Sequence, residues 1–286
     1  MMPLLRPCPS AADAESQVPS FGPDRVIIEF LGVSGSGKST LAQALAARFE
    51  QQGYRTRLLT MQRPTALGRV LGVLHKFGNM CRVAFGHRDE LSIARYLMGL
   101  FPQGNLLNHL RVMLYILYLF SLRSKFSGDC QIAIFDQGFA QAIYSLALFS
   151  QRRGADEFAD AFGSIPKPDL VVSLGLPPEV VAQRLGERRG LAGVARVTAT
   201  DSEAMRRSFR LITRIEGVLK ESGCRVIHYC PGNAVSIERS TDDLYRTLRC
   251  VVGEPRSARA WRPSLGAARD APEVAKAACL FITEKW

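Results

Sequence analysis

The sequence predicts an α/β protein with a parallel five-stranded sheet and helices on both of its faces. Five short runs rich in β-branched residues are bounded by residues that break regular structure, which is typical of buried parallel strands. These runs are Val26–Leu31, Thr56–Met61, Gln131–Asp136, Asp169–Leu174 and Arg225–Cys230. Helical patterns separate the runs, and this alternation implies right-handed crossovers that bring the strand ends to one edge of the sheet.

Six segments carry the clearest helical patterns. They are Ser39–Gln52, Leu106–Lys125, Ala140–Arg153, Pro178–Arg189, Ser202–Glu221 and Asp242–Val252. A proline pair suits the first turn of the fourth segment, and Asp201 with Glu203 can cap the fifth. We expect one domain over residues 24–252. Residues 1–23 and 253–286 lack a regular apolar pattern, so we expect a disordered N-terminal tail and a mostly disordered C-terminal tail.

A glycine-rich loop follows the first expected strand. Gly32 to Ser39 form the pattern G-x-x-x-x-G-K-S and lead into the first expected helix. In this setting the pattern indicates a phosphate-binding loop, in which backbone N–H groups and a helix N-terminus bind the phosphates of a nucleotide. The expected nucleotide contacts are Gly32, Val33, Ser34, Gly35, Ser36, Gly37, Lys38, Ser39 and Thr40.

This loop predicts ATP and Mg²⁺ as cofactors and a three-layer P-loop NTPase fold. We expect Lys38 to reach the β- and γ-phosphates and the Ser39 hydroxyl to bind Mg²⁺. The alternative is a flexible glycine turn between a strand and a helix, which leaves the lysine unexplained.

Asp136 is the candidate for a second metal ligand and, with Lys38, for a catalytic residue. It follows the apolar run Ile132–Phe135, as expected of a Walker B strand. The alternative is an aspartate that only begins the turn before Gly138. Glu29, in the first strand, is a weaker candidate that could support water around the metal or pair with the nearby arginine.

Three further arginines are candidate catalytic residues: Arg184, Arg188 and Arg189. Arginines beside a glycine-hinged loop can close over a transferring phosphoryl group, neutralise its oxygens and exclude water. We therefore expect a lid at residues 184–200. The alternative is a solvated helix face on which Glu187 pairs locally.

The charge of the chain favours acidic partners. The sequence has 37 Lys or Arg against 26 Asp or Glu, a net charge of +11. Residues 64–126 hold eight Lys or Arg against Asp89 and Glu90, a balance of +6, so we expect a basic helical segment that binds a small anionic acceptor. Nucleic acid is not expected, because the basic residues lack the interleaved aromatic residues of a stacking platform.

Cysteine usage and hydropathy predict a cytoplasmic protein. The seven cysteines are scattered, with no spacing typical of zinc or of a disulfide framework. The N-terminus has no continuous apolar run of a secretory signal. The apolar run Val112–Leu122 has 11 residues, fewer than the roughly 20 that a bilayer span needs, so no transmembrane segment is expected. A homodimer stays an open possibility.

The order of these parts resembles that of the thymidylate kinase group of P-loop nucleoside and nucleotide kinases. The resemblance covers about residues 25–250, and its specific motifs lie at 32–40, 131–138 and 167–189. It implies that Lys38, Ser39 and Asp136 hold a nucleoside triphosphate and Mg²⁺.

Two positions depart from that family. Gln137 stands where the family has an arginine that grips the acceptor phosphate, and Ser34 stands where it usually has aspartate. The loop is instead similar to that of gluconate kinases and adenylylsulfate kinases, so the resemblance does not extend to thymidylate specificity. ABC-transporter ATPases share this loop, but the chain has neither their Leu-Ser-Gly-Gly-Gln type signature nor Asp-Glu after the Walker B strand.

Three functions follow from these features. The first is a kinase that transfers the γ-phosphoryl group of ATP to a small acceptor of nucleotide, nucleoside or metabolite type, probed best by acceptor-stimulated ADP release. The second is a nucleotide-dependent regulatory ATPase or switch that binds a protein partner, which the Gln137 departure favours. The third, nucleic-acid binding through the positive charge, has the least support.

Overall fold

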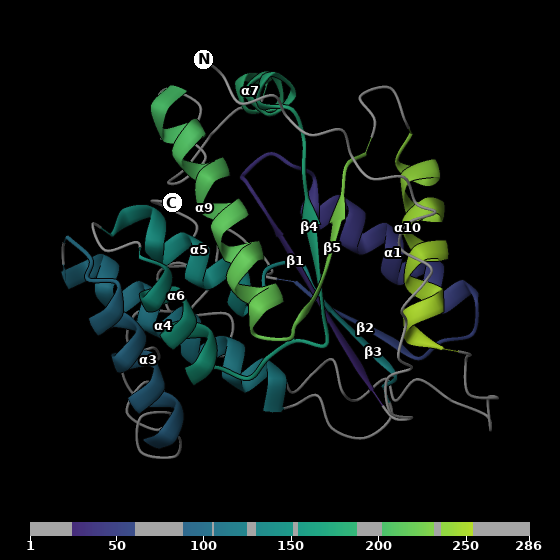
Figure 1. The fold of residues 1–286 in the computed structure, drawn as a ribbon. Coiled ribbons are helices and arrows are strands. Elements are labelled where there is room, and N and C mark those ends of the chain that lie inside the picture. Colours follow the sequence, from purple (N-terminus) through teal and green to yellow (C-terminus); the bar gives the residue numbers. More distant parts are fainter. Residues whose placement is uncertain are drawn as a thin grey trace, which may run out of the picture.

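The computed structural model describes the central part of the chain, and its core is a five-stranded sheet. The described ranges are 25–60, 88–104, 106–124, 130–150, 154–187, 202–231 and 236–253. The strands are β1 (Val26–Gly32), β2 (Thr56–Leu59), β3 (Ile132–Phe135), β4 (Leu170–Leu174) and β5 (Arg225–Tyr229). Their order is β2-β3-β1-β4-β5, and every neighbouring pair is parallel (Figure 1). The predicted parallel sheet is therefore confirmed.

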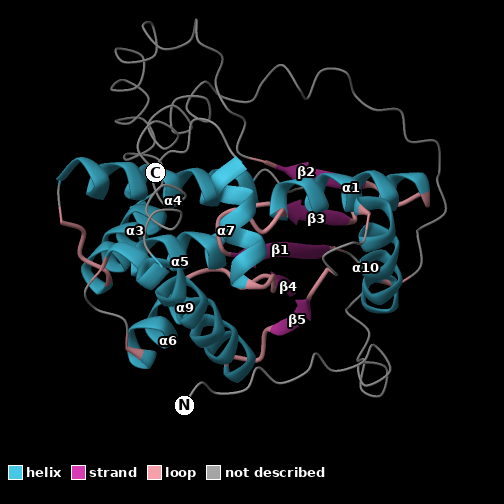
Figure 2. Cartoon of the chain, turned by 90° about the horizontal axis from the view of Figure 1, so that it is seen from above, coloured by secondary structure: helices cyan, strands magenta, loops and turns pink. Residues whose placement is uncertain are grey.

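Helices cover both faces of this sheet, as the sequence predicts. One face carries α1 (Lys38–Gln51) and α10 (Ile237–Val252), which pack against each other. The other side holds α3 (Arg88–Leu100), α4 (Leu106–Ser124), α5 (Phe139–Phe149), α6 (Ala155–Ser164) and α9 (Ser202–Glu221). Figure 2 shows the strands between these two groups, with α7 (Pro178–Glu187) at one end of the sheet.

The central strand β1 is buried along its whole length, and its side chains alternate between two cores. Ile28 and Phe30 belong to the core under α1 and α10, where the rings of Phe49 and Tyr245 meet edge-on with centroids 5.1 Å apart. Leu31 belongs to the larger core on the opposite face. Burial on both faces explains why this strand reads as a continuous apolar run.

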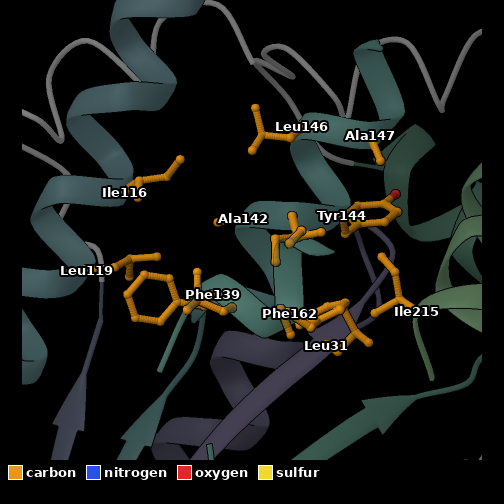
Figure 3. Packing of buried hydrophobic residues seen from close by; sticks show 14 of the residues in the cluster. Leu31, Ile116, Leu119, Phe139, Ala142, Tyr144, Leu146, Ala147, Phe162 and Ile215 are labelled. Carbon is orange, nitrogen blue, oxygen red and sulfur yellow. The ribbon is translucent and has the colours of Figure 1, made fainter. Parts of the chain in front are cut away.

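Helix α5 runs through the middle of the larger core. Its residues Phe139 and Ile143 are almost fully buried, and Figure 3 shows α5 side chains between those of α4, α6 and α9. A helix that is apolar on nearly every side needs such a shell, because each large side chain gains about 1.5–3 kcal/mol when it leaves water. Because α5 begins directly after β3, this shell also fixes the position of the residues that join them.

Several predicted boundaries were wrong. Helix α5 ends at Phe149 instead of Arg153, because Ser150 has extended backbone with ψ 155°. Helix α10 begins at Ile237, five residues before the predicted Asp242, because the Ser236 hydroxyl accepts a hydrogen bond from the Arg239 N–H and caps this end.

The sequence also missed two features of the helical layer. Helix α6 was not predicted, and the basic segment 64–126 contains two separate helices, α3 and α4, in its described part. The predicted tails lie outside the described residues. None of the helices in the described ranges is long and apolar enough to cross a bilayer.

Candidate functional site

The sheet register brings the glycine-rich loop and Asp136 to the same edge. Glu29 of β1 pairs with Phe135 of β3 in a parallel register, so Asp136, directly after β3, lies at the edge of the sheet where β1 ends at Gly32. The Ser39 hydroxyl donates a hydrogen bond to Asp136 Oδ2 over 3.0 Å. Asp136 is 4% exposed, whereas Ser39 is exposed. The two predicted metal ligands, 97 positions apart in the sequence, therefore lie in direct contact.

The backbone of the loop takes a shape that glycine allows. Gly35 and Gly37 have φ values of 85° and 87°, in the left-handed region that other residues rarely adopt. The Ser36 N–H donates to the Val33 carbonyl, which closes a turn. Gly37 is the N-cap of α1 and provides no side-chain acceptor. The first-turn N–H groups of α1 thus lie beside the loop, where the helix dipole favours an anion.

Lys38 lies across the loop instead of pointing into solvent. Its Nζ donates to the carbonyl oxygens of Gly32 and Val33, each over 2.9 Å, and the residue is 9% exposed. A positive charge is therefore held inside the turn by neutral carbonyl dipoles.

Helix α7 lies beyond one end of the sheet (Figure 1, top) and packs against the loop. Leu185 lies 3.1 Å from the position that a β-carbon on Gly35 would take. A guanidinium nitrogen of Arg184 lies 3.5 Å from the corresponding position on Gly37. The first candidate lid arginine is thus beside the phosphate loop, whereas Arg188 and Arg189 lie outside the described residues.

The other predicted loop residues differ in exposure. Ser36 is buried, Gly35 and Ser34 are half-buried, and Thr40 is exposed in the first turn of α1. Glu187, the alternative local partner for the arginines, accepts a hydrogen bond from Gln183 over 2.9 Å.

Gln141 is a site residue that the sequence did not single out. Its Oε1 accepts a hydrogen bond from the Gly32 N–H over 3.2 Å, and the residue is 7% exposed. Gln141 is the one amide side chain in the apolar helix α5. This isolated amide in an apolar run could have marked it as a functional candidate in the sequence. Gln141 links the start of α5 to the start of the loop.

Glu29 contacts the start of α5. Its Oε2 accepts the Ala140 N–H over 3.0 Å, and it is 1% exposed. Burial raises the pKa of Glu29, and backbone hydrogen bonds from Ala140 and Phe139 oppose this shift. A β-carbon on Gly138 would collide with the Glu29 carboxylate, so glycine allows this close approach. The position fits a buried cap at the positive end of α5.

These features combine a glycine-rich loop after β1, a helix that starts at its lysine and a carboxylate after the neighbouring parallel strand. This is a P-loop NTPase fold.

Neither models of protein families nor curated proteins match the chain. Among solved structures, the chain is similar to deoxyadenosine kinase from M. mycoides, determined with products dCMP and a flexible dCDP bound. The sequences are 15% identical, the TM-score is 0.42, and the match covers 78% of this chain and 98% of the other.

Proposed function

We propose that the chain is an ATP-dependent phosphotransferase that moves the γ-phosphoryl group of ATP to a small anionic acceptor. The observation that carries this proposal is the contact between the Ser39 hydroxyl and Asp136 Oδ2 beside the loop. A hydroxyl and a carboxylate are hard oxygen ligands of the kind that Mg²⁺ prefers. Ser39 and Asp136 also lie at the carboxyl edge of the parallel sheet, which is where open α/β folds bind their ligands.

The residues of the loop suit a triphosphate. Gly35 and Gly37 hold the curled backbone, and Lys38 already places its ammonium within the turn. Phosphate oxygens are stronger acceptors for this ammonium than the two neutral carbonyls that it now contacts. Mg²⁺, when bound to Ser39 and Asp136, would neutralise charge on the β- and γ-phosphates.

Arg184 adds a second positive charge at the loop. Its place beside Gly37 supports a role in neutralising the oxygens of the transferred group, with Arg188 and Arg189 as proposed members of the same lid. In phosphoryl transfer, positioning and charge neutralisation supply most of the rate enhancement. No strong base is needed if the acceptor is itself a phosphate, because that group is already ionised.

The acceptor class follows from charge and from one substitution. The basic segment 64–126 favours an anionic acceptor, and Gln137 in place of the arginine of thymidylate kinases argues against a nucleoside monophosphate bound in that way. The Gln137 carbonyl accepts a hydrogen bond from the Tyr115 hydroxyl over 3.2 Å, so this backbone position is tied to α4. A cytoplasmic location and a possible homodimer stay predictions.

The test measures ADP release by the full chain with Mg²⁺, ATP and a panel of nucleosides, nucleotides and phosphorylated metabolites. We expect stimulation by at least one anionic acceptor and loss of turnover in Lys38→Ala. The matched control is Lys167→Ala, because Lys167 also donates to a backbone carbonyl, that of Ser222, but is exposed and outside the loop.

Two outcomes would contradict the proposal. Slow hydrolysis that no acceptor stimulates would favour the regulatory ATPase. Calorimetry that shows no ATP binding with Mg²⁺, or equal binding and turnover in wild type and Lys38→Ala, would remove the nucleotide site itself.

A further inference from the structure

A second polar cluster lies at the carboxyl ends of β4 and β5, outside the phosphate loop. We call it the thiol cluster; its members are Ser173, Glu216, His228 and Cys230. Ser173 and His228 are register partners on adjacent strands, and Glu216 comes from α9. His228 Nδ1 lies 3.1 Å from Glu216 Oε1, and the Ser173 hydroxyl donates to the same carboxylate oxygen. One carboxylate therefore orients the imidazole from its Nδ1 side.

The opposite side of the imidazole faces a thiol. Cys230, which is exposed, lies on this side of the ring. A β-carbon on Gly175 would lie 2.5 Å from His228 Nε2 and 3.0 Å from Cys230 Sγ. The Nε2 edge and the sulfur thus converge on the backbone of Gly175, and the absence of a side chain there lets them approach.

The charges around the cluster favour a protonated imidazole. Hydrogen bonds to Cys230 and Glu216 raise the pKa of His228 to about 10, against the opposing effect of burial. Burial raises the pKa of Glu216, but hydrogen bonds from His228 and Ser173 outweigh it, and Lys220 on the same helix acts in the same direction, so the net shift is downward. The titratable groups that face the imidazole are therefore a carboxylate and a thiol.

The arrangement is that of an activated nucleophile and differs from a metal site. A thiol beside an imidazolium that a carboxylate orients is the general pattern of a reactive cysteine. Within the described ranges, no set of three or more His, Cys, Asp or Glu side chains is arranged to hold a metal.

We infer that Cys230 is a nucleophilic thiol, activated by His228 and positioned through Glu216, and that it is a site of covalent modification by hydroperoxides and soft electrophiles. With a hydroperoxide, the thiolate attacks one peroxide oxygen and the O–O bond breaks. The sulfur loses two electrons and becomes a sulfenic acid, while the leaving hydroxide or alkoxide takes a proton and departs as water or alcohol. With an alkylating electrophile, an S–C bond forms and a halide leaves.

The experiment measures alkylation of the folded full chain by iodoacetamide between pH 5.5 and 9, with rates read for each cysteine by peptide mass spectrometry. Cys250 is the internal reference, because it is also exposed and lies on α10, outside the cluster. At pH 6.5 we expect Cys230 to react about five- to tenfold faster than Cys250, since a higher thiolate fraction is partly offset by lower intrinsic nucleophilicity. Hydrogen peroxide followed by dimedone should label Cys230 first.

Three variants test the assigned roles. His228→Gln should bring the Cys230 rate down to that of Cys250 and shift its pH profile upward. Gly175→Ala should do the same without removing a charge, because the new methyl group pushes the ring and the sulfur apart. Gly99→Ala is the matched control, since its new methyl group meets nothing within 4 Å.

Circular dichroism confirms that each variant is folded, and the rate of the buried Cys224 reports on local unfolding. Equal rates for Cys230 and Cys250 in the wild-type protein would overturn the inference. So would a Cys230 rate that His228→Gln leaves unchanged. Neither result depends on nucleotide binding, so the thiol cluster and the proposed kinase site succeed or fail separately.

Discussion

Two strand ends at the same edge of the sheet hold a positive charge in different ways. At the end of β1, the Lys38 ammonium contacts two neutral carbonyl oxygens. At the end of β5, the His228 imidazole contacts the Glu216 carboxylate, which the Ser173 hydroxyl also contacts. A hydrogen bond with a charged donor or acceptor is roughly twice as strong as one between neutral groups, so both cations make charge-assisted bonds, and His228 also faces a charged acceptor.

The difference in partners indicates different roles for Lys38 and His228. Phosphate oxygens are stronger acceptors than carbonyl oxygens, so Lys38 suits an anion-binding site. At the end of β5 the Glu216 carboxylate orients the imidazole from its Nδ1 side, so His228 suits activation of the neighbouring Cys230 thiol. Neutralising the carboxylate at each end should therefore have different effects. Asp136→Asn should lower ATP turnover, whereas Glu216→Gln should change the pH dependence of stability.

The largest expected effect is at the loop. Asp136→Asn keeps an acceptor for the Ser39 hydroxyl but removes the charge that a divalent cation needs. We expect ATP turnover to fall by about 100-fold or more, with the melting temperature nearly unchanged. Turnover at several Mg²⁺ concentrations and a thermal melt measure the two effects. Asp169→Asn is the control, because Asp169 Oδ2 accepts the Ile27 N–H and has no place in the loop; loss of turnover there would weaken the comparison.

A substitution in the loop backbone should have the next largest effect. Gly35→Ala places a β-carbon at φ 85° and 3.1 Å from Leu185, so we expect a loss of about 1–3 kcal/mol in stability. ATP affinity should fall as well, because the loop must shift. Gly53→Ala shares the positive φ, at 86°, but its methyl group meets nothing within 4 Å. A denaturant melt of both variants separates backbone strain from contact with α7, and equal losses would show that α7 does not constrain the loop.

Loss of the Gln141 amide should destabilise the molecule moderately. Gln141→Leu leaves the buried Gly32 N–H without its acceptor, which costs about 1–3 kcal/mol. Because this N–H begins the loop, we also expect weaker ATP binding. Ser145→Ala in the same helix is the control, since its hydroxyl only donates to the Gln141 carbonyl within α5. Calorimetry measures the ATP affinity, and a chemical melt measures the unfolding free energy. Unchanged ATP affinity in Gln141→Leu would limit the role of the amide to folding.

The smallest expected effect concerns pH and the thiol cluster. The pKa of His228 is raised from 6.5 to about 10 in the folded protein, so protonated His228 contributes its full stabilisation below pH 6.5 and loses it as the pH rises toward 10. The unfolding free energy of the wild type, minus that of His228→Gln, should therefore decline across this range. Glu216→Gln should flatten the same decline and leave ATP turnover unchanged. A difference that stays constant from pH 6 to pH 10 would contradict an imidazolium at this position.

The chemistry of the loop followed from local sequence. Between Gly32 and Ser39, the glycines, the lysine and the serine occur in fixed order over a few residues, and such spacing alone determines which groups a curled backbone presents. The parallel sheet also followed from local pattern, because β-branched runs bounded by breakers and separated by helices leave few topologies. The contact between Ser39 and Asp136 is the consequence of both.

Other features depended on neighbours that no local pattern specifies. Gln141 reads as one amide in an apolar helix, and only the packing of α5 against β1 brings it to the Gly32 N–H. The thiol cluster joins residues of β4, β5 and α9, so its members were predicted only as parts of strands and a helix. From the sequence, Arg184 could belong to a solvated helix face or to a lid, and only the placement of α7 brings it beside Gly37.

The sequence by itself determined the glycine-rich loop, the alternation of strands and helices and the carboxylate after β3, because each depends on residues adjacent in the chain. The tertiary structure decided which side chains meet across elements: Gln141 with the loop, Glu29 with the start of α5 and His228 with Glu216. The physical reason is that backbone preference and apolar periodicity act over a few residues. A hydrogen bond between residues a hundred positions apart depends on how whole helices pack, and many sequences satisfy the same packing.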